Sequence, residues 1–177
     1  ATRRQGIMVA QGNPLGIISI ADLFKPGVRF VNRQPGSGTR VLFDLLLEAE
    51  QLEGSKLPGY DTSEYTHAAV AAYIASGMAD AGFGVETAAR KFNLGFVPVV
   101  SERYFLICNT ESLELPAVKE LLNILRSPAF KAAVNDLRGY DAELCGKLMT
   151  LEEAFPEFAG AEKPERRAGA KRGAPVH

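Results

Sequence analysis

The sequence predicts an α/β protein with a mainly parallel sheet, and two features lead to that fold class. Short apolar runs that suit buried strands alternate with longer segments whose apolar residues recur at helical spacing. Turns that contain glycine or proline separate most of these segments. Strands that alternate with helices form parallel sheets, because each helix crosses one face and brings the chain back to the edge where the strand began.

The first part of the chain begins with a strand rather than a helix. Residues 6–10 form a short apolar run that ends at a turn over residues 12–14, and residues 19–24 suit a short helix. Residues 28–31 alternate as a strand does. A helix follows over residues 37–50, where apolar side chains recur every three to four positions.

The rest of the chain continues the alternation of helices and strands. We expect further helices over residues 66–76, 85–92, 116–125 and 127–137, and strands over residues 79–83 and, as a strand pair, 96–109. From residue 159 onward the sequence is polar and has no periodicity, which predicts a disordered tail.

Composition narrows the range of functions. Hydrophobic residues make up 46% and charged residues 23% of the 177 residues, as in ordinary globular proteins. A net charge of −1 argues against direct binding of nucleic acid. No apolar run reaches the roughly 20 residues of a membrane span, and no signal peptide is evident, so we expect a cytoplasmic protein. Cys108 and Cys145 lack metal-ligand spacing, so we expect neither a zinc site nor a disulfide framework.

The segment from Asn32 to Arg40 is the first candidate site, since its glycines and hydroxyls stand between a predicted strand and a predicted helix. The free N–H groups of a helix N-terminus and the positive end of its dipole favour an oxyanion. Ser37, Gly38, Thr39 and Arg40 would form the cradle. The spacing matches neither a Walker loop nor a dinucleotide-binding motif. In the alternative, Ser37 only caps the helix and Arg40 faces solvent.

Thr66 and His67 form the second candidate site, because they lie at the start of the helix predicted over residues 66–76. Thr66 can cap that helix and His67 can donate a hydrogen bond to the same ligand, although a lone histidine is commonly structural. Tyr104 lies in a predicted strand region and can present its hydroxyl to a cleft, although a packed strand aromatic is the commoner case. No arrangement of serine, histidine and acid has recognisable catalytic spacing, so we expect no enzyme.

Three motifs occur in one order and resemble a known family. They are Val31-Asn32-Arg33-Gln34-Pro35-Gly36-Ser37-Gly38-Thr39-Arg40, Thr66-His67-Ala68-Ala69-Val70-Ala71 and Gly77-Met78-Ala79-Asp80-Ala81-Gly82-Phe83-Gly84. Together they resemble the periplasmic-binding-protein-like domain grouped with molybdate-binding proteins, over about residues 5–142. The resemblance implies a type II solute-binding fold with two α/β lobes, in which helix N-termini hold the ligand.

The resemblance also implies a ligand and a division into lobes. It makes molybdate or tungstate the leading ligand of Ser37, Gly38, Thr39, Arg40, Thr66 and His67, with no cofactor or metal. Residues 1–25 and 99–158 would belong to the first lobe and residues 26–98 to a complete central lobe, with residues 159–177 as the tail. Many members of the family are cytoplasmic sensors attached to DNA-binding domains or to molybdenum-cofactor enzymes.

The family domain usually has a substantial N-terminal segment before the strand that corresponds to residues 6–10, and we expect this chain to lack it. A half-formed first lobe exposes apolar surface, so a homodimer or a partner chain is expected to complete it. The leading hypothesis is an oxyanion-binding or sensing domain. The alternatives are an accessory domain of a molybdenum-cofactor biosynthesis enzyme and a degenerate interaction domain.

Overall fold

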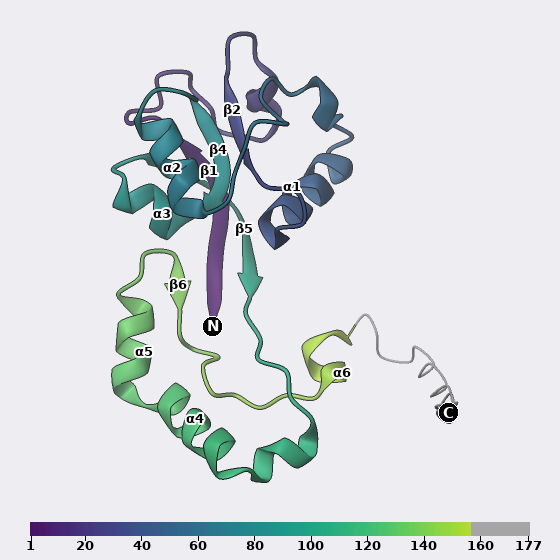
Figure 1. Cartoon of the computed structure of the whole chain (residues 1–177), viewed down its shortest axis with the longest axis vertical. Helices are drawn as coiled ribbons and strands as arrows, with labels where there is room; N and C mark the ends of the chain where they lie inside the picture. Colours follow the sequence, from purple (N-terminus) through teal and green to yellow (C-terminus); the bar gives the residue numbers. More distant parts are fainter. Residues whose placement is uncertain (157–177) are drawn as a thin grey trace, which may run out of the picture. The chain divides into compact units, whose positions relative to one another are not determined.

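The computed structural model describes residues 1–156 and confirms the α/β class. Residues Ala1–Gly146 form one compact unit (Figure 1), and the described residues from Lys147 belong to a second. Of that second unit, the described part contains α6 (Leu151–Ala154), which begins with a capping box between Thr150 and Glu153. The tail predicted over residues 159–177 lies outside the described residues. No helix in the described part of the chain is long and apolar enough to cross a membrane.

The first unit contains six strands and five α-helices among its described residues. The strands are β1 (Thr2–Val9), β2 (Phe30–Arg33), β3 (Ser63–Glu64), β4 (Ala81–Val85), β5 (Gly95–Arg103) and β6 (Tyr140–Asp141). The α-helices are α1 (Gly38–Ala49), α2 (His67–Ala75), α3 (Glu86–Lys91), α4 (Pro116–Arg126) and α5 (Pro128–Asn135). Three short 3-10 helices are η1 (Ala21–Phe24), η2 (Gly54–Lys56) and η3 (Thr110–Glu114).

The sheet is mixed, with the strand order β3-β2-β4-β1-β5, and β6 pairs with the N-terminal end of β1. Strand β2 is parallel to both β3 and β4, as the alternation of strands and helices predicts. Strand β1 corrects the expectation of a mainly parallel sheet, because it lies antiparallel between β4 and β5. The β4-α3-β5 crossover thus brings two parallel strands to opposite sides of β1.

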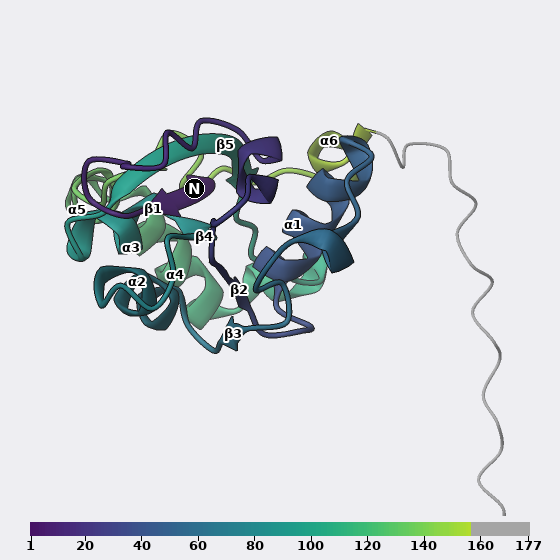
Figure 2. The same cartoon turned by 90° about the horizontal axis from the view of Figure 1, so that it is seen from above.

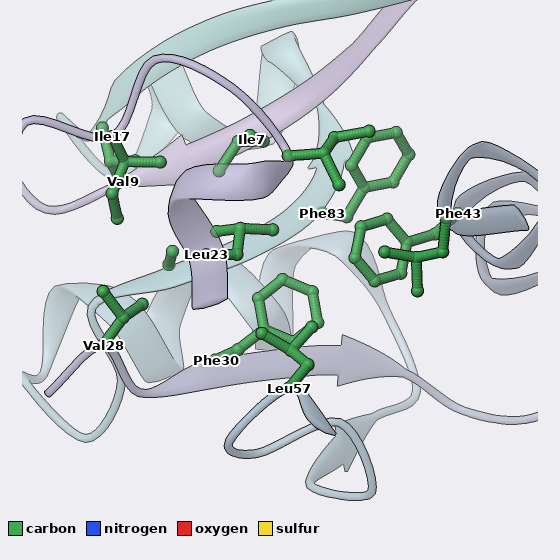
Figure 3. Close-up of a cluster of buried hydrophobic side chains, with 12 residues drawn as sticks. Ile7, Val9, Ile17, Leu23, Val28, Phe30, Phe43, Leu57 and Phe83 are labelled. Carbon is green, nitrogen blue, oxygen red and sulfur yellow. The ribbon is translucent and has the colours of Figure 1, made fainter. Parts of the chain in front are cut away.

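Two apolar clusters cover the two faces of this sheet. On one face, Phe43 from α1 stacks on Phe30 and contacts Phe83, with ring centroids 5.1 Å apart in both pairs (Figure 3). On the other face, Val70 and Ile74 from α2 join residues of α3. Figure 2 shows α1 on the opposite side of the sheet from α2 and α3. This layered part, with strands β1 to β5 and helices α1 to α3, is called the central lobe below, and it includes β1, which lies outside the residues 26–98 predicted for that lobe.

Residues 105–146, called the distal segment below, are packed very differently. Neither α4 nor α5 has a buried residue, although α4 is amphipathic. Several of the segment's large apolar side chains are exposed, namely Leu106, Ile107, Leu115, Leu121, Ile124 and Leu137. The strand pair expected over residues 96–109 is wrong, because β5 ends at Arg103 and no second strand forms before η3. The apolar run continues past Arg103, but its side chains are exposed and find no neighbouring strand.

Candidate functional site

A pocket of about 340 Å³ lies where two helices begin, beside the ends of two long strands. Helices α1 and α2 follow the neighbouring parallel strands β2 and β3. The carboxyl ends of parallel strands lie at the same edge of a sheet, so the N-termini of both helices lie there too. The pocket is lined by Arg3, Arg33, Ser37, Gly38, Thr39, Tyr65, Thr66, His67 and Tyr104.

The N-terminus of α1 provides one wall of the pocket. Gly36 turns the chain after β2 with a φ of 83°, a value that favours glycine. The Oγ atom of Ser37 then caps the helix by accepting a hydrogen bond from the backbone N of Arg40 at 3.2 Å. The N–H groups of Gly38 and Thr39 precede the first intrahelical hydrogen bond and remain available to a ligand.

The N-terminus of α2 provides the neighbouring wall. The Oγ1 atom of Thr66 caps α2 by accepting a hydrogen bond from the backbone N of Ala69 at 3.0 Å. His67 is the first residue of the helix and also lines the pocket. Each helix N-terminus carries about half a positive charge, so the two walls together favour an anion.

Arg33 is the last residue of β2 and only 9% of its surface is exposed. Its Nη2 atom donates to the backbone O of Tyr65 at 3.0 Å and its Nε atom donates to Oε1 of Gln34 at 3.2 Å. No carboxylate among the described residues forms an ion pair with it. Burial, and then the charge of Arg3, lowers the pKa of Arg33. The pocket therefore contains a buried positive charge whose counter-charge the described chain does not provide.

Arg3 and Tyr104 approach the pocket from β1 and from the end of β5. Arg3 forms an ion pair with Glu102, the residue opposite it in the β1-β5 pairing. Its guanidinium lies over the ring of Tyr104, 4.3 Å from the ring centre. The charge of Arg3, unlike that of Arg33, is thus already matched.

His67 is neutral near pH 7. Burial, followed by the charges of Arg33 and Arg3, lowers its pKa to about 4. Its Nδ1 atom is buried and has no hydrogen-bond partner within the described chain. A buried N–H group without an acceptor is rare, so the neutral ring is expected to carry its proton on Nε2. His67 can then donate one hydrogen bond without adding charge.

The structure brings together five of the six residues predicted from the sequence, namely Ser37, Gly38, Thr39, Thr66 and His67. Arg40 is the exception, because its side chain lies outside the pocket lining. It pairs with Asp44 at 3.0 Å and lies 3.9 Å from the centre of the Tyr60 ring. The alternative prediction, in which Arg40 faces solvent, is also wrong, because Arg40 is largely buried. Ligand binding by the five lining residues stays a prediction.

Sequence reasoning gave Arg3, Arg33 and Tyr65 no binding role of their own, and it favoured a packed position over a cleft position for Tyr104. Tyr104 lines the pocket and is exposed, so the expectation of a packed strand aromatic is wrong. The sequence did contain a signal for Arg33, which lies between the strand predicted over residues 28–31 and the loop that contains Gly36 and Gly38. The described residues contain no cluster of histidine, cysteine and acidic side chains that could hold a metal ion.

Comparison with known proteins identifies the family. The model of the PBP superfamily domain matches residues 1–126. The uncharacterised protein YvgK of Bacillus subtilis is 36% identical over 148 residues, which are 83% of this chain and 47% of YvgK. An uncharacterised protein from the 5′ region of a 2Fe-2S ferredoxin gene of Clostridium pasteurianum is 32% identical over 111 residues, which are 62% of this chain and 98% of that protein. The chain thus spans about half the length of YvgK.

Solved structures support a type II periplasmic-binding-protein-like fold. The arginine-, lysine- and histidine-binding protein ArtJ of Geobacillus stearothermophilus has a TM-score of 0.55 and 16% identity, with 81% of this chain and 62% of ArtJ covered. The ancestral amino-acid-binding protein AncCDT-1 has a TM-score of 0.52 and 22% identity, with 77% and 57% covered. A histidine kinase sensor domain has a TM-score of 0.53 and 14% identity, with 79% and 60% covered. At these identities the likeness concerns the fold.

Proposed function

The chain belongs to the PBP superfamily domain family, and we propose that it binds a small oxyanion without catalysing a reaction on it. The observation that carries this proposal is Arg33, a nearly buried guanidinium that faces the pocket without a carboxylate partner in the described chain. Burying an unpaired charge is costly. A bound anion would supply the missing charge and accept hydrogen bonds from the guanidinium.

The two helix N-termini support the same ligand class. The N–H groups of Gly38 and Thr39 on α1, and the first turn of α2, supply donors with fixed directions and partial positive charge. The hydroxyl of Thr39 and the neutral ring of His67 add side-chain donors. Donors from several directions suit an anion with several equivalent oxygen atoms.

Molybdate and tungstate are the first candidates, because the three sequence motifs resemble the family grouped with molybdate-binding proteins. Sulfate and phosphate would accept the same hydrogen bonds, so relative affinity decides among them. Amino acids are a second candidate, because solved proteins of similar fold are named as amino-acid-binding. An α-amino group commonly requires a carboxylate, and no acidic side chain is among the residues that line the pocket.

Titration calorimetry with molybdate, tungstate, sulfate and phosphate tests the proposal. We expect saturable binding of at least one anion, and a loss of affinity of about tenfold to a hundredfold in Arg33→Gln, because charge-assisted hydrogen bonds are lost. Arg40→Gln serves as the matched control, since Arg40 lies outside the pocket and should leave the affinity within about threefold. Absence of heat with all four anions in a folded sample would contradict the proposal.

We also propose that a second copy of the chain, or a partner chain, covers the exposed apolar side chains of the distal segment. In the fold neighbours, about two fifths of the chain has no counterpart here, since only 57% to 62% of each is covered. The cytoplasmic location and a sensing role stay predictions.

A further inference from the structure

We infer that the pocket selects solutes with two negative charges and no ammonium group, and so rejects the amino acids that solved proteins of similar fold are named for. This inference rests on the proposed function and adds a rule of selection to it. It follows from the charges that face the pocket, taken one by one.

Arg33 contributes one full positive charge. Only 9% of its surface is exposed, and its hydrogen bonds to Tyr65 and Gln34 go to neutral oxygen atoms. Arg3 contributes little net charge, because Glu102 pairs with it. Glu102 is held in place by Nε2 of Gln5, which donates to its Oε2 atom at 2.7 Å. Glu102 therefore neutralises Arg3 and does not itself line the pocket.

The helix N-termini contribute about one further positive charge. Helix α1 has 12 residues and α2 has 9, long enough for each to place about half a positive charge at its first turn. Ser37 and Thr66 cap the two helices through neutral hydroxyls, so the caps add no counter-charge. His67 is neutral near pH 7 because burial, then Arg33 and Arg3, lower its pKa to about 4.

Arg33 and the two helix N-termini together contribute close to two positive charges. No aspartate or glutamate is among the residues that line the pocket. A dianion balances this charge, whereas a monoanion balances half of it. A zwitterionic amino acid would place its ammonium group in a pocket lined by Arg3 and Arg33, with no carboxylate to receive it. The described pocket thus repels the group that amino-acid-binding sites must attract.

Sulfate and perchlorate make a sharp test because they share a tetrahedral shape and differ by one charge. Titration calorimetry at pH 7 and constant ionic strength should give sulfate at least about tenfold higher affinity than perchlorate. Among four-carbon acids, succinate should bind more tightly than butyrate, and 4-aminobutyrate should not bind measurably. Glutamine and arginine should not bind measurably either.

Variants of Arg33 show whether the count of charges is responsible. Arg33→Gln should reduce the sulfate-to-perchlorate ratio to below about threefold, and Arg33→Lys should restore it because the charge returns. Lys119→Gln removes one positive charge from the exposed surface of α4 and should leave the ratio unchanged.

The possible failures are distinguishable. If sulfate and perchlorate bind equally, or glutamine binds as tightly as sulfate, the inference is overturned while anion binding stands. If no anion binds to the folded protein, the proposed function fails and the inference fails with it.

Discussion

The central lobe and the distal segment use similar secondary structure but differ in what their helices bury. Helix α1 buries Phe43 and Leu47 against the sheet, and α2 buries Val70, Ala71 and Ile74 on the other face. Helices α4 and α5 bury no residue, and only Ala142 and Cys145 are buried apolar residues in residues 105–146. The apolar stripe of α4 is therefore only partly covered within the described chain.

This difference indicates where stability resides. Tertiary packing of an apolar face, rather than intrinsic propensity, supplies most of the stability of a helix in a protein. The distal segment is held mainly through polar contacts near β6. The backbone N of Arg4 donates to the O of Gly139 at 2.8 Å, and Oγ1 of Thr87 donates to the O of Arg138 at 2.7 Å. The segment should therefore open at a lower free energy than the central lobe.

The largest expected effect compares one apolar residue from each region, a buried one in the central lobe and an exposed one in the distal segment. Phe43→Ala removes a ring that contacts Phe30 and Phe83, and should lower the free energy of unfolding by about 3–5 kcal/mol. Leu121→Ala on α4 should cost less than about 1 kcal/mol, because Leu121 is 42% exposed. Urea denaturation followed by circular dichroism measures both. Equal losses would mean that α4 is packed as firmly as α1.

The second prediction tests whether a second copy of the chain covers the exposed apolar side chains of the distal segment. Leu121→Glu combined with Ile124→Glu should weaken self-association of the chain by about tenfold or more, because charge on an apolar interface must be desolvated. Light scattering coupled to size exclusion measures the mass as a function of protein concentration. Glu120→Gln, a change on the same helix that adds no charge to the face, is the control. If the wild-type chain stays monomeric at high concentration, the proposal that a second copy covers the distal segment is contradicted.

Local patterns explain which parts of the fold could be predicted. Helix α1 was expected over residues 37–50 and extends over Gly38–Ala49, because its periodicity reflects a face that is really buried. The same periodicity predicted α4, although α4 has no buried residue. A sequence pattern shows that a helix has an apolar side, but it does not show whether another element covers that side. The antiparallel placement of β1 depends on pairing with strands more than 70 residues away, as in Ile7 opposite Phe83. No local signal encodes that choice.

The part of the site that could be predicted from the sequence is the pair of helix N-termini, because their capping residues are recognisable. Ser37 and Thr66 were identified as caps, and the structure gives both the expected hydrogen bonds. The guanidiniums were harder to judge, because an arginine in a sequence does not show whether it has a partner. Arg40 finds Asp44 one helical turn later, whereas Arg33 finds only neutral acceptors.

The third prediction uses pH to titrate His67, which lies in the central lobe. Among residues 1–156 His67 is the only histidine, and its pKa is lowered from 6.5 to about 4 by burial, Arg33 and Arg3. Between these values the unfolded chain binds the proton and the folded chain does not, so the free energy of unfolding falls as the pH drops from 6.5 to 4. We expect a loss of about 1–2 kcal/mol, reduced because His67 is partly exposed.

Urea denaturation at several pH values measures this loss, and His67→Gln should remove it. The aspartates with lowered pKa, Asp22 and Asp80, titrate below this range and act on stability only in stronger acid. A slope that persists between pH 6.5 and 4 in His67→Gln would assign the effect to another group.

The smallest expected effect compares two serine caps of the same kind. Ser37 accepts from the backbone N of Arg40 at 3.2 Å on α1, and Ser127 accepts from the backbone N of Phe130 at 3.2 Å on α5. Ser37→Ala should lower the free energy of unfolding by about 1 kcal/mol, because fraying of α1 uncovers the core around Phe43. Ser127→Ala should cost only a few tenths of a kcal/mol, because α5 buries nothing that fraying would expose. The two caps accept hydrogen bonds of equal length, but the Ser127 hydroxyl also donates to the backbone O of Ile124 at 2.8 Å. A smaller loss in Ser127→Ala would therefore show that the weaker packing behind α5 outweighs this additional hydrogen bond, and a loss equal to that of Ser37→Ala would contradict the expectation.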